Sequence, residues 1–429
     1  MDNRSKAILV FSMMLMMGVL TGCIQSKQKE VNAEKGSETK DSLLTGTNEN
    51  YYLDEEDRNL IQKGNAFSLQ LFQNIALKET KKNTFISTIG FLYSLNIMNL
   101  GAKGKTRQEI CDAIGLDSLD IGRMNALCRR MIKGQEKMQN DDLPGLSSNL
   151  LTGCALLLKN DVEISGKFTH DFEQFYYGQI IQGCFDDRMQ SQIDEWCSDK
   201  TDHQINNLPI ERDAKSILAV VNCFKGKWEI EFNSDRTKEE PFYGGKGKTV
   251  MMMNDTDSDR RFTFAQRPGY SLLRIPYRGG YAMFVILPEK GKTLSSIIHK
   301  LDWDEFQKSV DNLSYYDLIH VKLPKFEMNY SWRADKLLES LGIRKVFDEK
   351  ADLDNMNSGL YVSTISQCAR VKVDEMGTDA SSLTSVVLKA KEETVKEITE
   401  AFFYADHPFA YIIRDVYGNL CMMGTYYGE

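Results

Sequence analysis

The chain has no excess of basic residues, and this excludes nucleic acid as an expected partner. Lysine and arginine number 53 against 61 aspartates and glutamates, for a net charge of −8 over 429 residues. A protein that binds a phosphate backbone carries a basic patch or stripe. The charge balance is that of an ordinary soluble protein, so we expect no DNA or RNA partner.

Residue patterns that would build an enzyme are also missing. The five histidines are scattered, with none at metal-ligand spacing, and no G-x-S-x-G nucleophile motif occurs. Three Gly-Lys-Thr triplets resemble part of a phosphate-binding loop, but the required upstream glycine is Asn99, Phe242 or Ile286 instead. Asp374 and Glu375 are adjacent in an alternating segment, so their side chains face opposite ways. We predict a protein that is not an enzyme and has no catalytic residue, metal or cofactor.

Cysteine occurs at nine positions but in no C-x-x-C pair. The spacing matches neither a zinc site nor a small disulfide framework. We predict that most of the cysteines in the body of the chain are buried apolar side chains. Export would permit disulfides, but spacing does not reveal their connectivity. The residues concerned are Cys111, Cys128, Cys154, Cys184, Cys197, Cys223, Cys368 and Cys421.

The N-terminus has the layout of an export signal. Arg4 and Lys6 precede an apolar run over residues 7–20. The run ends in Leu20-Thr21-Gly22-Cys23, which resembles a bacterial lipobox in which Cys23 is acylated and becomes the mature N-terminus. A simple transmembrane anchor is the alternative, although the run is short for a membrane span. We predict a lipoprotein signal peptide over residues 1–22.

Residues 23–50 have a different composition. After Cys23 they are rich in Lys, Glu, Gln, Ser, Thr and Gly and contain few large apolar side chains, a composition typical of disorder. A flexible coil of about 27 residues spans roughly 25 to 30 Å on average. We predict a tether that holds a folded domain in the bacterial cell envelope, either in the periplasm or exposed at the surface.

From residue 51 the pattern becomes that of a folded domain. Phe67, Leu71 and Ile75 recur at the spacing of a buried helical face. Apolar runs such as 272–277 and 281–287 indicate strands, and strands and helices alternate without a regular βαβ order. We find no internal repeat. The pattern predicts an α+β fold over residues 51–429.

The stretch 371–408, VKVDEMGTDASSLTSVVLKAKEETVKEITEAFFYADHP, is the most informative segment. It begins as an alternating strand, meets Gly377, continues through small residues and then becomes charged. Because successive strand side chains point to opposite faces, the segment is suited either to an exposed loop or to a buried strand. One face would carry Thr378, Ala380, Ser382, Thr384, Val386 and Leu388.

Several strings together resemble the serpin family. DEMGTDASS at 374–382 resembles the serpin hinge, and FFYADHPFAYIIRDVYGNLCMMG at 402–424 resembles the C-terminal signature. Phe224-Lys225-Gly226-Lys227-Trp228 is a further specific match. The resemblance covers about residues 54–427. It implies one domain with three β-sheets, about nine helices and an exposed reactive loop at about residues 375–400.

This resemblance implies an inhibitor of serine endopeptidases, with cysteine endopeptidases as a further target class. A protease cuts the loop and is trapped as an acyl-enzyme when the freed hinge inserts as a new strand into the central sheet. The inward hinge side chains must enter without clashes. Those of this chain are small, as in inhibitory members. The hinge residues are Glu375, Gly377, Thr378, Asp379, Ala380, Ser381 and Ser382.

The family spacing also indicates a reactive bond. Counting 16 steps from the hinge glutamate places cleavage between Lys391 and Glu392, and a lysine there suits a trypsin-like protease. The loop is about six residues longer than in a familiar inhibitor, so Lys389 and Lys396 are alternatives. A lysine-rich stretch is also what a solvated loop contains.

Two further family regions match unevenly. Trp228 corresponds to the tryptophan where the loop enters the central sheet, termed the breach. In the shutter, midway down that sheet, Asn83 and Ser87 match, but the family proline, second serine and histidine are Thr88, Gly90 and Gln367. The family asparagine is replaced by Val220, unless a two-residue shift brings Asn222 into its place. A buried polar network with partners missing is destabilising.

The partner expected from the resemblance is a target protease, bound by a monomer. The alternative is a serpin-fold binding or chaperone-like protein that is cleaved without trapping anything. The extended charged loop and the altered shutter residues favour that alternative.

Overall fold

Strand β4 (Ser216–Lys227) lies at the centre of the fold. Eleven of its twelve residues are buried. Its sequence, SILAVVNCFKGK, is a nearly continuous apolar or small run, as expected for a strand covered on both faces. Val220 belongs to the main core cluster, whereas its neighbour Val221 belongs to a second cluster on the opposite face. The strand therefore separates two packed layers.

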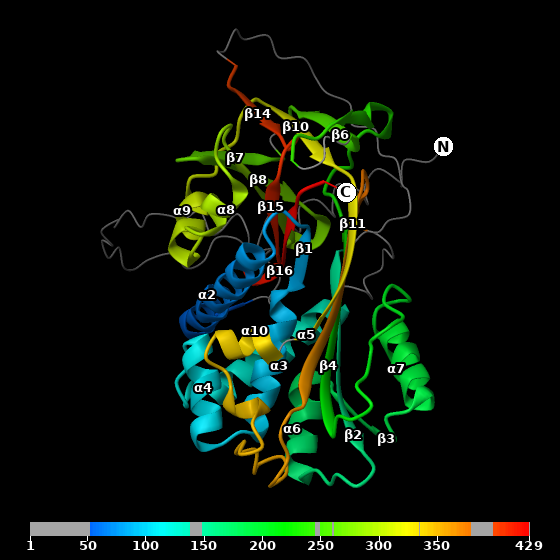
Figure 1. Ribbon diagram of the computed structural model, residues 1–429. Helices are drawn as coiled ribbons and strands as arrows, with labels where there is room; N and C mark the ends of the chain where they lie inside the picture. Colours follow the sequence, from blue (N-terminus) through cyan, green and yellow to red (C-terminus); the bar gives the residue numbers. More distant parts are fainter. Residues whose placement is uncertain are drawn as a thin grey trace, which may run out of the picture. The chain divides into compact units, whose positions relative to one another are not determined.

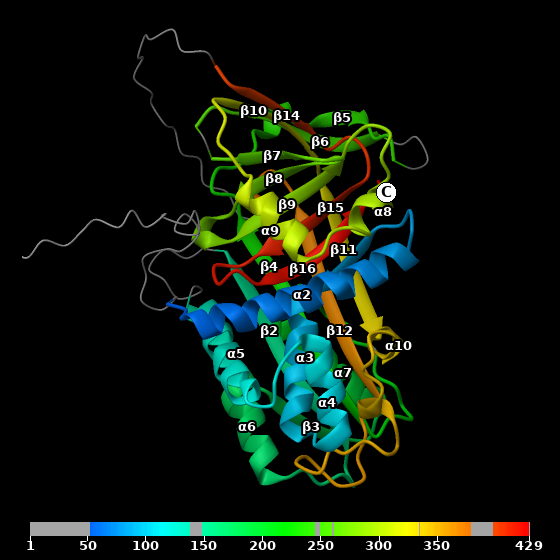
Figure 2. The same ribbon diagram turned by 90° about the vertical axis from the view of Figure 1, so that its left-hand side faces the viewer.

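The computed structural model describes residues 52–137, 148–244, 249–259, 261–333, 335–378 and 398–428 (Figures 1 and 2). These residues belong to one unit, Leu43–Glu429.

The sheet around β4 is called the large sheet below. Its strand order is β11-β12-β4-β2-β3, and the two-residue strand β13 also pairs with β4. β12 runs parallel to β4, from Thr364 opposite Ile217 to Arg370 opposite Cys223. β2 and β4 are antiparallel. The strands other than β4 are β2 (Asn149–Lys159), β3 (Gln179–Gly183), β11 (Phe326–Arg333), β12 (Thr364–Val373) and β13 (Gly377–Thr378).

Two other sheets complete the described strands. One has the order β1-β16-β15-β9-β8-β7 and the other β14-β10-β6-β5. The first comprises β1 (Thr84–Ser87), β7 (Thr263–Arg267), β8 (Tyr270–Pro276), β9 (Ala282–Pro288), β15 (Phe409–Arg414) and β16 (Leu420–Tyr426). The second, called the four-stranded sheet below, comprises β5 (Lys238–Pro241), β6 (Thr249–Asp257), β10 (Leu318–Pro324) and β14 (Glu400–Tyr404).

Nine α-helices occur in the described residues, so the predicted α+β class with three sheets and about nine helices is confirmed. They are α2 (Glu55–Lys78), α3 (Thr88–Gly101), α4 (Gly104–Ile114), α5 (Asp120–Lys137), α6 (Gly166–Tyr176), α7 (Asp187–Lys200), α8 (Leu294–Ile298), α9 (Trp303–Asp311) and α10 (Asp335–Ser340). Three short 3₁₀ turns are η3 (Ser234–Arg236), η4 (Arg278–Gly280) and η5 (Lys345–Phe347). The predicted helical face of Phe67, Leu71 and Ile75 lies in α2, and all three side chains are buried.

Helices cover the large sheet on both faces. Figure 1 shows α7 on one side of β4 and α3, α5 and α6 on the other. Helix α3 is buried along nearly its whole length, which matches its largely apolar sequence TIGFLYSLNIMNLG. Its N-terminus is capped by Ser87, which is also the last residue of β1. This junction places Ser87 against the middle of the large sheet.

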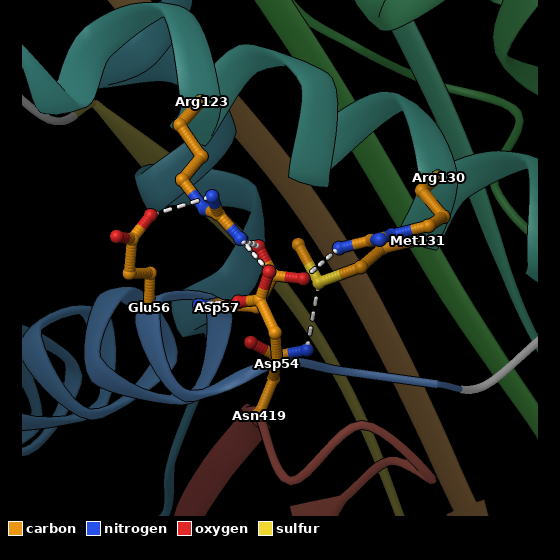
Figure 3. A network of polar contacts seen from close by, with 7 residues as sticks. All are labelled: Asp54, Glu56, Asp57, Arg123, Arg130, Met131 and Asn419. Atoms are coloured by element: carbon orange, nitrogen blue, oxygen red, sulfur yellow. Dashed lines mark hydrogen bonds and ion pairs between the residues drawn. The ribbon is translucent and has the colours of Figure 1, made fainter.

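A network of charged residues holds the start of α2 against α5 (Figure 3). The Asp57 carboxylate is almost fully buried and accepts hydrogen bonds from both Arg123 and Arg130. Arg123 also contacts Asp54 and Glu56. Because the buried carboxylate has two guanidinium partners, its desolvation is offset. The network fixes the point at which the described chain enters the domain.

Seven of the eight cysteines in the described residues are buried, and all eight are free thiols. The prediction that most are buried side chains is confirmed, and only Cys184 is exposed among them. Among the residues that the structure describes, no helix combines the length and apolar character needed to cross a membrane.

Candidate functional site

The site begins at the end of β4, where Trp228 fixes a turn of the chain that follows β12. Trp228 is fully buried and stacks on Tyr277 with 4.1 Å between ring centroids. Its indole Nε1 donates to the carbonyl oxygen of Asp374 at 2.9 Å, and its backbone N–H donates to the carbonyl oxygen of Met376 at 3.1 Å. The tryptophan therefore both packs the core and holds the turn.

This turn reverses the chain at Gly377. The backbone N–H of Asp374 donates to Gly377 at 2.8 Å, and that of Gly377 donates to Asp374 at 3.2 Å. Gly377 has φ +134°, and a Cβ there would lie 2.1 Å from the Gly226 carbonyl oxygen. Only glycine tolerates both the backbone conformation and this close approach. The chain then pairs antiparallel with β4, with Gly377 opposite Lys227 and Thr378 opposite Gly226.

Glu375 is held at the turn by a cation. Its carboxylate forms an ion pair with Lys325 Nζ at 2.7 Å, and its carbonyl oxygen accepts from the Phe232 N–H at 2.8 Å. Burial raises the pKa of Glu375, but the hydrogen bonds that the carboxylate accepts, from Lys325 first, and the charge of Lys325 together outweigh burial, so the net pKa lies below its ordinary value. Lys325 and the neighbouring Lys372–Asp374 ion pair line a cavity of about 400 Å³.

Strands β12 and β4 pair along only part of their length. Their parallel ladder ends at Arg370 opposite Cys223. Beyond that point β12 continues to pair with β11 up to Val373 opposite Phe326, whereas β4 pairs with β13 at Lys227 and Gly226. Strands β12 and β4 are therefore not paired with each other between Arg370 and the turn at Gly377. Parallel pairing is slightly less stable per residue than antiparallel pairing, so we expect this ladder to be weaker than the antiparallel ladders that flank it, β11–β12 and β2–β4.

A buried polar cluster, called the Ser87 cluster below, joins the two strands at the middle of their ladder. Gln367 of β12 donates from Nε2 to the Ser87 carbonyl oxygen at 2.9 Å and accepts the Ser87 N–H at 3.2 Å. The Ser87 hydroxyl donates to Asn222 Oδ1 at 2.9 Å, and Asn222 Nδ2 donates to Thr152 of β2 at 3.0 Å. Ser87 thus links β12 to β4, and Asn222 links β4 to β2.

Gly90 gives this cluster its space. A Cβ at Gly90 would lie 2.1 Å from Asn222 Oδ1 and 2.6 Å from Gln367 Nε2. The glycine in the first turn of α3 therefore lets two large amide side chains approach the helix.

A model of the family described as "Serpin (serine protease inhibitor)" matches residues 62–428. This chain belongs to the serpin family. Among curated proteins it is similar to "Iripin-2" of Ixodes ricinus, with 26% identity over 84% of this chain and 91% of the relative. It is likewise 26% identical to "Serine proteinase inhibitor 1" of Monkeypox virus, over 83% of this chain and 99% of the relative.

Two solved structures have the same fold. The native state of the thermophilic serpin tengpin matches with a TM-score of 0.76 and 24% identity, over 91% of this chain and 99% of the other. Native protease nexin-1 with heparin matches with a TM-score of 0.74 and 24% identity, over 87% of this chain and all of the other.

The serpin residues named from the sequence are partly brought together. Ser87 and Gln367 lie in one cluster, while Trp228, Glu375 and Gly377 meet at the turn. Asn83 is not part of the Ser87 cluster. Its Oδ1 accepts the backbone N–H of Tyr427 at 2.7 Å, so it ties the start of β1 to the C-terminus.

The two-residue shift that the sequence left open is resolved by the contacts. Asn222, not Val220, meets Ser87, and Val220 is fully buried in the main core. Sequence reasoning missed Thr152, because nothing in its local sequence marks it. Only the pairing of β2 with β4, which sets Thr152 opposite Asn222, reveals it.

The remaining site predictions lie outside the described residues. They are Cys23, Asp379, Ala380, Ser381, Ser382, Lys389, Lys391, Glu392 and Lys396. Of Thr378 only the backbone is described. Among the described residues, no group of three or more histidine, cysteine or acidic side chains is arranged to hold a metal ion.

Proposed function

We propose that this serpin inhibits serine endopeptidases by reactive-loop cleavage, covalent trapping and insertion of the loop between β12 and β4. Cysteine endopeptidases, which also form acyl-enzymes, are a further target class. The observation that carries the proposal is β13, which already runs antiparallel to β4 at the point where β4 and β12 stop pairing. The names of the relatives, several of them protease inhibitors, support the same proposal.

The direction of β13 is the one that insertion requires. β12 and β4 are parallel, and the loop leaves the carboxyl end of β12 and turns back at Gly377. A strand that continues from this turn runs antiparallel to both neighbours. After insertion, two antiparallel ladders, one with β12 and one with β4, would replace the parallel ladder between those strands. The backbone hydrogen-bonding groups of both flanking strands would again be satisfied.

The register of β13 makes a prediction for the inserted strand. If insertion kept the pairing of Gly377 with Lys227, Ala380 would come to lie opposite Phe224 and Ser382 opposite Asn222. Directly opposed residues share a face, and Phe224 belongs to the main core cluster. The small residues at even positions would therefore enter the core face, where a large or charged group would clash or be buried without a partner.

Trapping depends on the relative rates of two steps, hydrolysis of the acyl-enzyme and insertion of the loop. The protease nucleophile attacks the carbonyl carbon of Lys391, the peptide bond breaks, and the α-amino group of Glu392 leaves with a proton. Hydrolysis of the acyl-enzyme by water would then release the active protease. Insertion of the freed strand before that step carries the protease away as a covalent adduct. A lysine on the acyl side suits a trypsin-like protease, with Lys389 and Lys396 as alternative cleavage sites.

The free energy available for insertion is large. Roughly a dozen added strand residues, each with a net hydrogen-bond contribution of about 0.5–1.5 kcal/mol, provide on the order of ten kcal/mol. This equals the whole unfolding free energy of many domains, which is about 5–15 kcal/mol. The uncleaved form would be held kinetically, because the Ser87 cluster must open first.

We further propose that the inhibitor acts as a lipid-anchored monomer of the bacterial cell envelope. Residues 1–22 would be removed as a signal peptide, Cys23 acylated, and residues 23–50 would tether a serpin domain over 51–429. The proposal rests on the apolar run and lipobox-like string alone. Metabolic labelling with a radioactive fatty acid tests it, since Cys23→Ala should abolish incorporation.

Incubation with trypsin-like, elastase-like and papain-like proteases tests the inhibitory mechanism. An SDS-resistant complex on denaturing gels is the expected result for at least the trypsin-like protease. Cleavage without such a complex across the panel, and without a gain in heat stability, would reject inhibition in favour of a serpin-fold binding protein. Mass spectrometry of the released peptide identifies the bond that is cut.

A further inference from the structure

The outer face of β14 carries exposed aromatic side chains next to the point where the loop returns. β14 is the edge strand of the four-stranded sheet, and its residues alternate between buried and exposed. Phe402 is 55% and Tyr404 38% exposed, whereas Phe403 between them is buried. Ile398, just before the strand, is 62% exposed, and Glu400 is the one exposed charged residue of β14. Edge strands usually carry charged side chains outward, so the two aromatic side chains beside Glu400 need an explanation.

These aromatic side chains are held in place. Phe402 stacks on His320 of β10 at 4.7 Å between ring centroids, and His320 Nδ1 lies 3.1 Å from the hydroxyl oxygen of Thr256. Tyr404 contacts Phe402 edge-on at 5.9 Å, and Lys322 Nζ lies 5.3 Å from the Tyr404 ring centroid. A preorganised aromatic surface loses little conformational entropy on binding, which favours its use as an interface.

The returning chain is also fixed. Thr399 donates from its N–H to Asp317 Oδ2 at 3.0 Å and from its hydroxyl to the same oxygen at 2.9 Å. The Asp317 N–H donates back to the Thr399 hydroxyl at 3.1 Å. Ile398 therefore stands at a defined position where the loop joins the domain.

Chain length brings a protease at the reactive bond close to this face. Ile398 lies seven positions after Lys391, a reach of at most about 25 Å. Thr378 lies thirteen positions before Lys391, which permits about 45 Å. A single-domain protease of about 220 residues has a radius of gyration of about 17 Å and so a diameter of about 45 Å. Its primed-side rim therefore lies within reach of β14.

We propose that Ile398, Phe402 and Tyr404 form a secondary docking surface for the protease that cuts the loop. The partner is a protease whose primed-side rim carries an exposed apolar or aromatic patch. The surface would select among proteases that accept the same scissile residue, because aromatic anchors at the centre of an interface contribute most of its binding energy. This inference rests on the proposed function and adds a specificity determinant to it.

The test measures second-order association rate constants for complex formation with two proteases that cut the same bond, trypsin and a second trypsin-like protease with a different surface. Phe402→Ala should lower the constant five- to thirty-fold for at least one of them, and by different factors for the two. Phe402→Tyr should restore most of the rate. Tyr52→Ala, which removes another exposed aromatic ring, is the matched control and should change nothing.

The outcomes separate this inference from the proposed function. Rates within two-fold of wild type for both proteases, or the same decrease for both, would overturn the docking surface and leave inhibition intact. If the wild type is cleaved without forming a complex, inhibition is rejected, and the same comparison is made on kcat/KM for loop cleavage. Loss of cleavage efficiency in Phe402→Ala would then support the surface, and unchanged efficiency would overturn it. A loop that neither protease cuts would overturn both proposals.

Discussion

Gln367 holds Ser87 by both ends of its side-chain amide, donating to the Ser87 carbonyl oxygen at 2.9 Å and accepting the Ser87 N–H at 3.2 Å. Ser87 in turn donates its hydroxyl to Asn222. One serine at the start of α3 therefore connects β12 and β4, the two strands that loop insertion must separate. A polar cluster whose buried groups are all paired stabilises the closed arrangement.

Replacement of Gln367 should change the rate of spontaneous loop insertion. The ring nitrogens of histidine diverge and cannot serve the N–H and carbonyl of the same residue together, so Gln367→His leaves one Ser87 group unpaired. An unpaired buried group costs about 1–3 kcal/mol, which should speed conversion to latent and polymeric forms. Native gels after mild heating measure those forms. Yields equal to wild type would count against the idea, and Gln108→His at an exposed position of α4 is the control.

Gly90→Ala should destabilise the protein by about 1–3 kcal/mol, because an extra methyl group overpacks the Ser87 cluster. The added Cβ would lie 2.1 Å from Asn222 Oδ1. Gly122→Ala in α5 is the matched control, since nothing lies within 4 Å of its Cβ, and alanine there should be neutral or slightly stabilising. Urea unfolding of the two variants tests the difference. Equal midpoints would contradict the described contact.

Two adjacent loop substitutions should behave oppositely if β13 sets the register of insertion. Ser382→Glu would bring a carboxylate opposite Asn222 on the core face, where an unpaired charge is strongly unfavourable. Ser381→Glu would lie on the other face, opposite Cys223 and beside Arg370, which pairs with Cys223 in the ladder. We expect Ser382→Glu to be cleaved as a substrate and Ser381→Glu to retain inhibition.

The measurement for this pair is the stoichiometry of inhibition by active-site titration, for a protease that the wild type traps. A large increase for Ser382→Glu alone supports the register. The reverse order would show that the inserted strand is shifted by one residue, which exchanges the two faces.

Asp415 should make stability decrease as pH rises from about 4 to about 6. Burial raises the pKa of Asp415 to about 6 from its ordinary value of 3.8, despite hydrogen bonds from Asn419. The folded state therefore binds a proton that the unfolded state has lost over this range, and stability present below pH 4 disappears as pH passes 6. The shift corresponds to about 3 kcal/mol at most.

Chemical unfolding at several pH values compares wild type with Asp415→Asn. Asparagine keeps the Oδ1 acceptor for the N–H groups of Tyr417 and Asn419 but cannot ionise. The wild type should lose stability relative to the variant between pH 4 and 7. Parallel pH curves for the two proteins would contradict a raised pKa at Asp415.

Part of the candidate site followed from local sequence. The alternating residues up to Gly377 and the small residues after it indicate a strand followed by a segment with one small face, because side-chain facing depends on neighbouring residues alone. The reversal at Gly377, where φ is +134°, and the pairing of β13 with β4 are known only from the structure. Trp228 was likewise marked by its string and lies at the turn.

The Ser87 cluster was only half predictable. Ser87 and Gln367 were named, but the choice between Val220 and Asn222 stayed open, Asn83 was grouped with residues that it does not contact, and Thr152 was not named. The contacts in question join residues 135 and 280 positions apart in the chain. Such pairs depend on which strands become neighbours and in what register, and no short-range pattern encodes this.

By itself the sequence determined the fold class, the strand that leads to Gly377, and the alternation of small residues beyond it, since backbone conformation and side-chain facing arise from near neighbours. Tertiary structure decided that β12 and β4 lie side by side in parallel, that Gln367 and Asn222 share Ser87, and that Phe402 stands exposed beside the returning loop. The physical reason is that burial and pairing are properties of the whole packed chain, in which distant segments compete for the same neighbours.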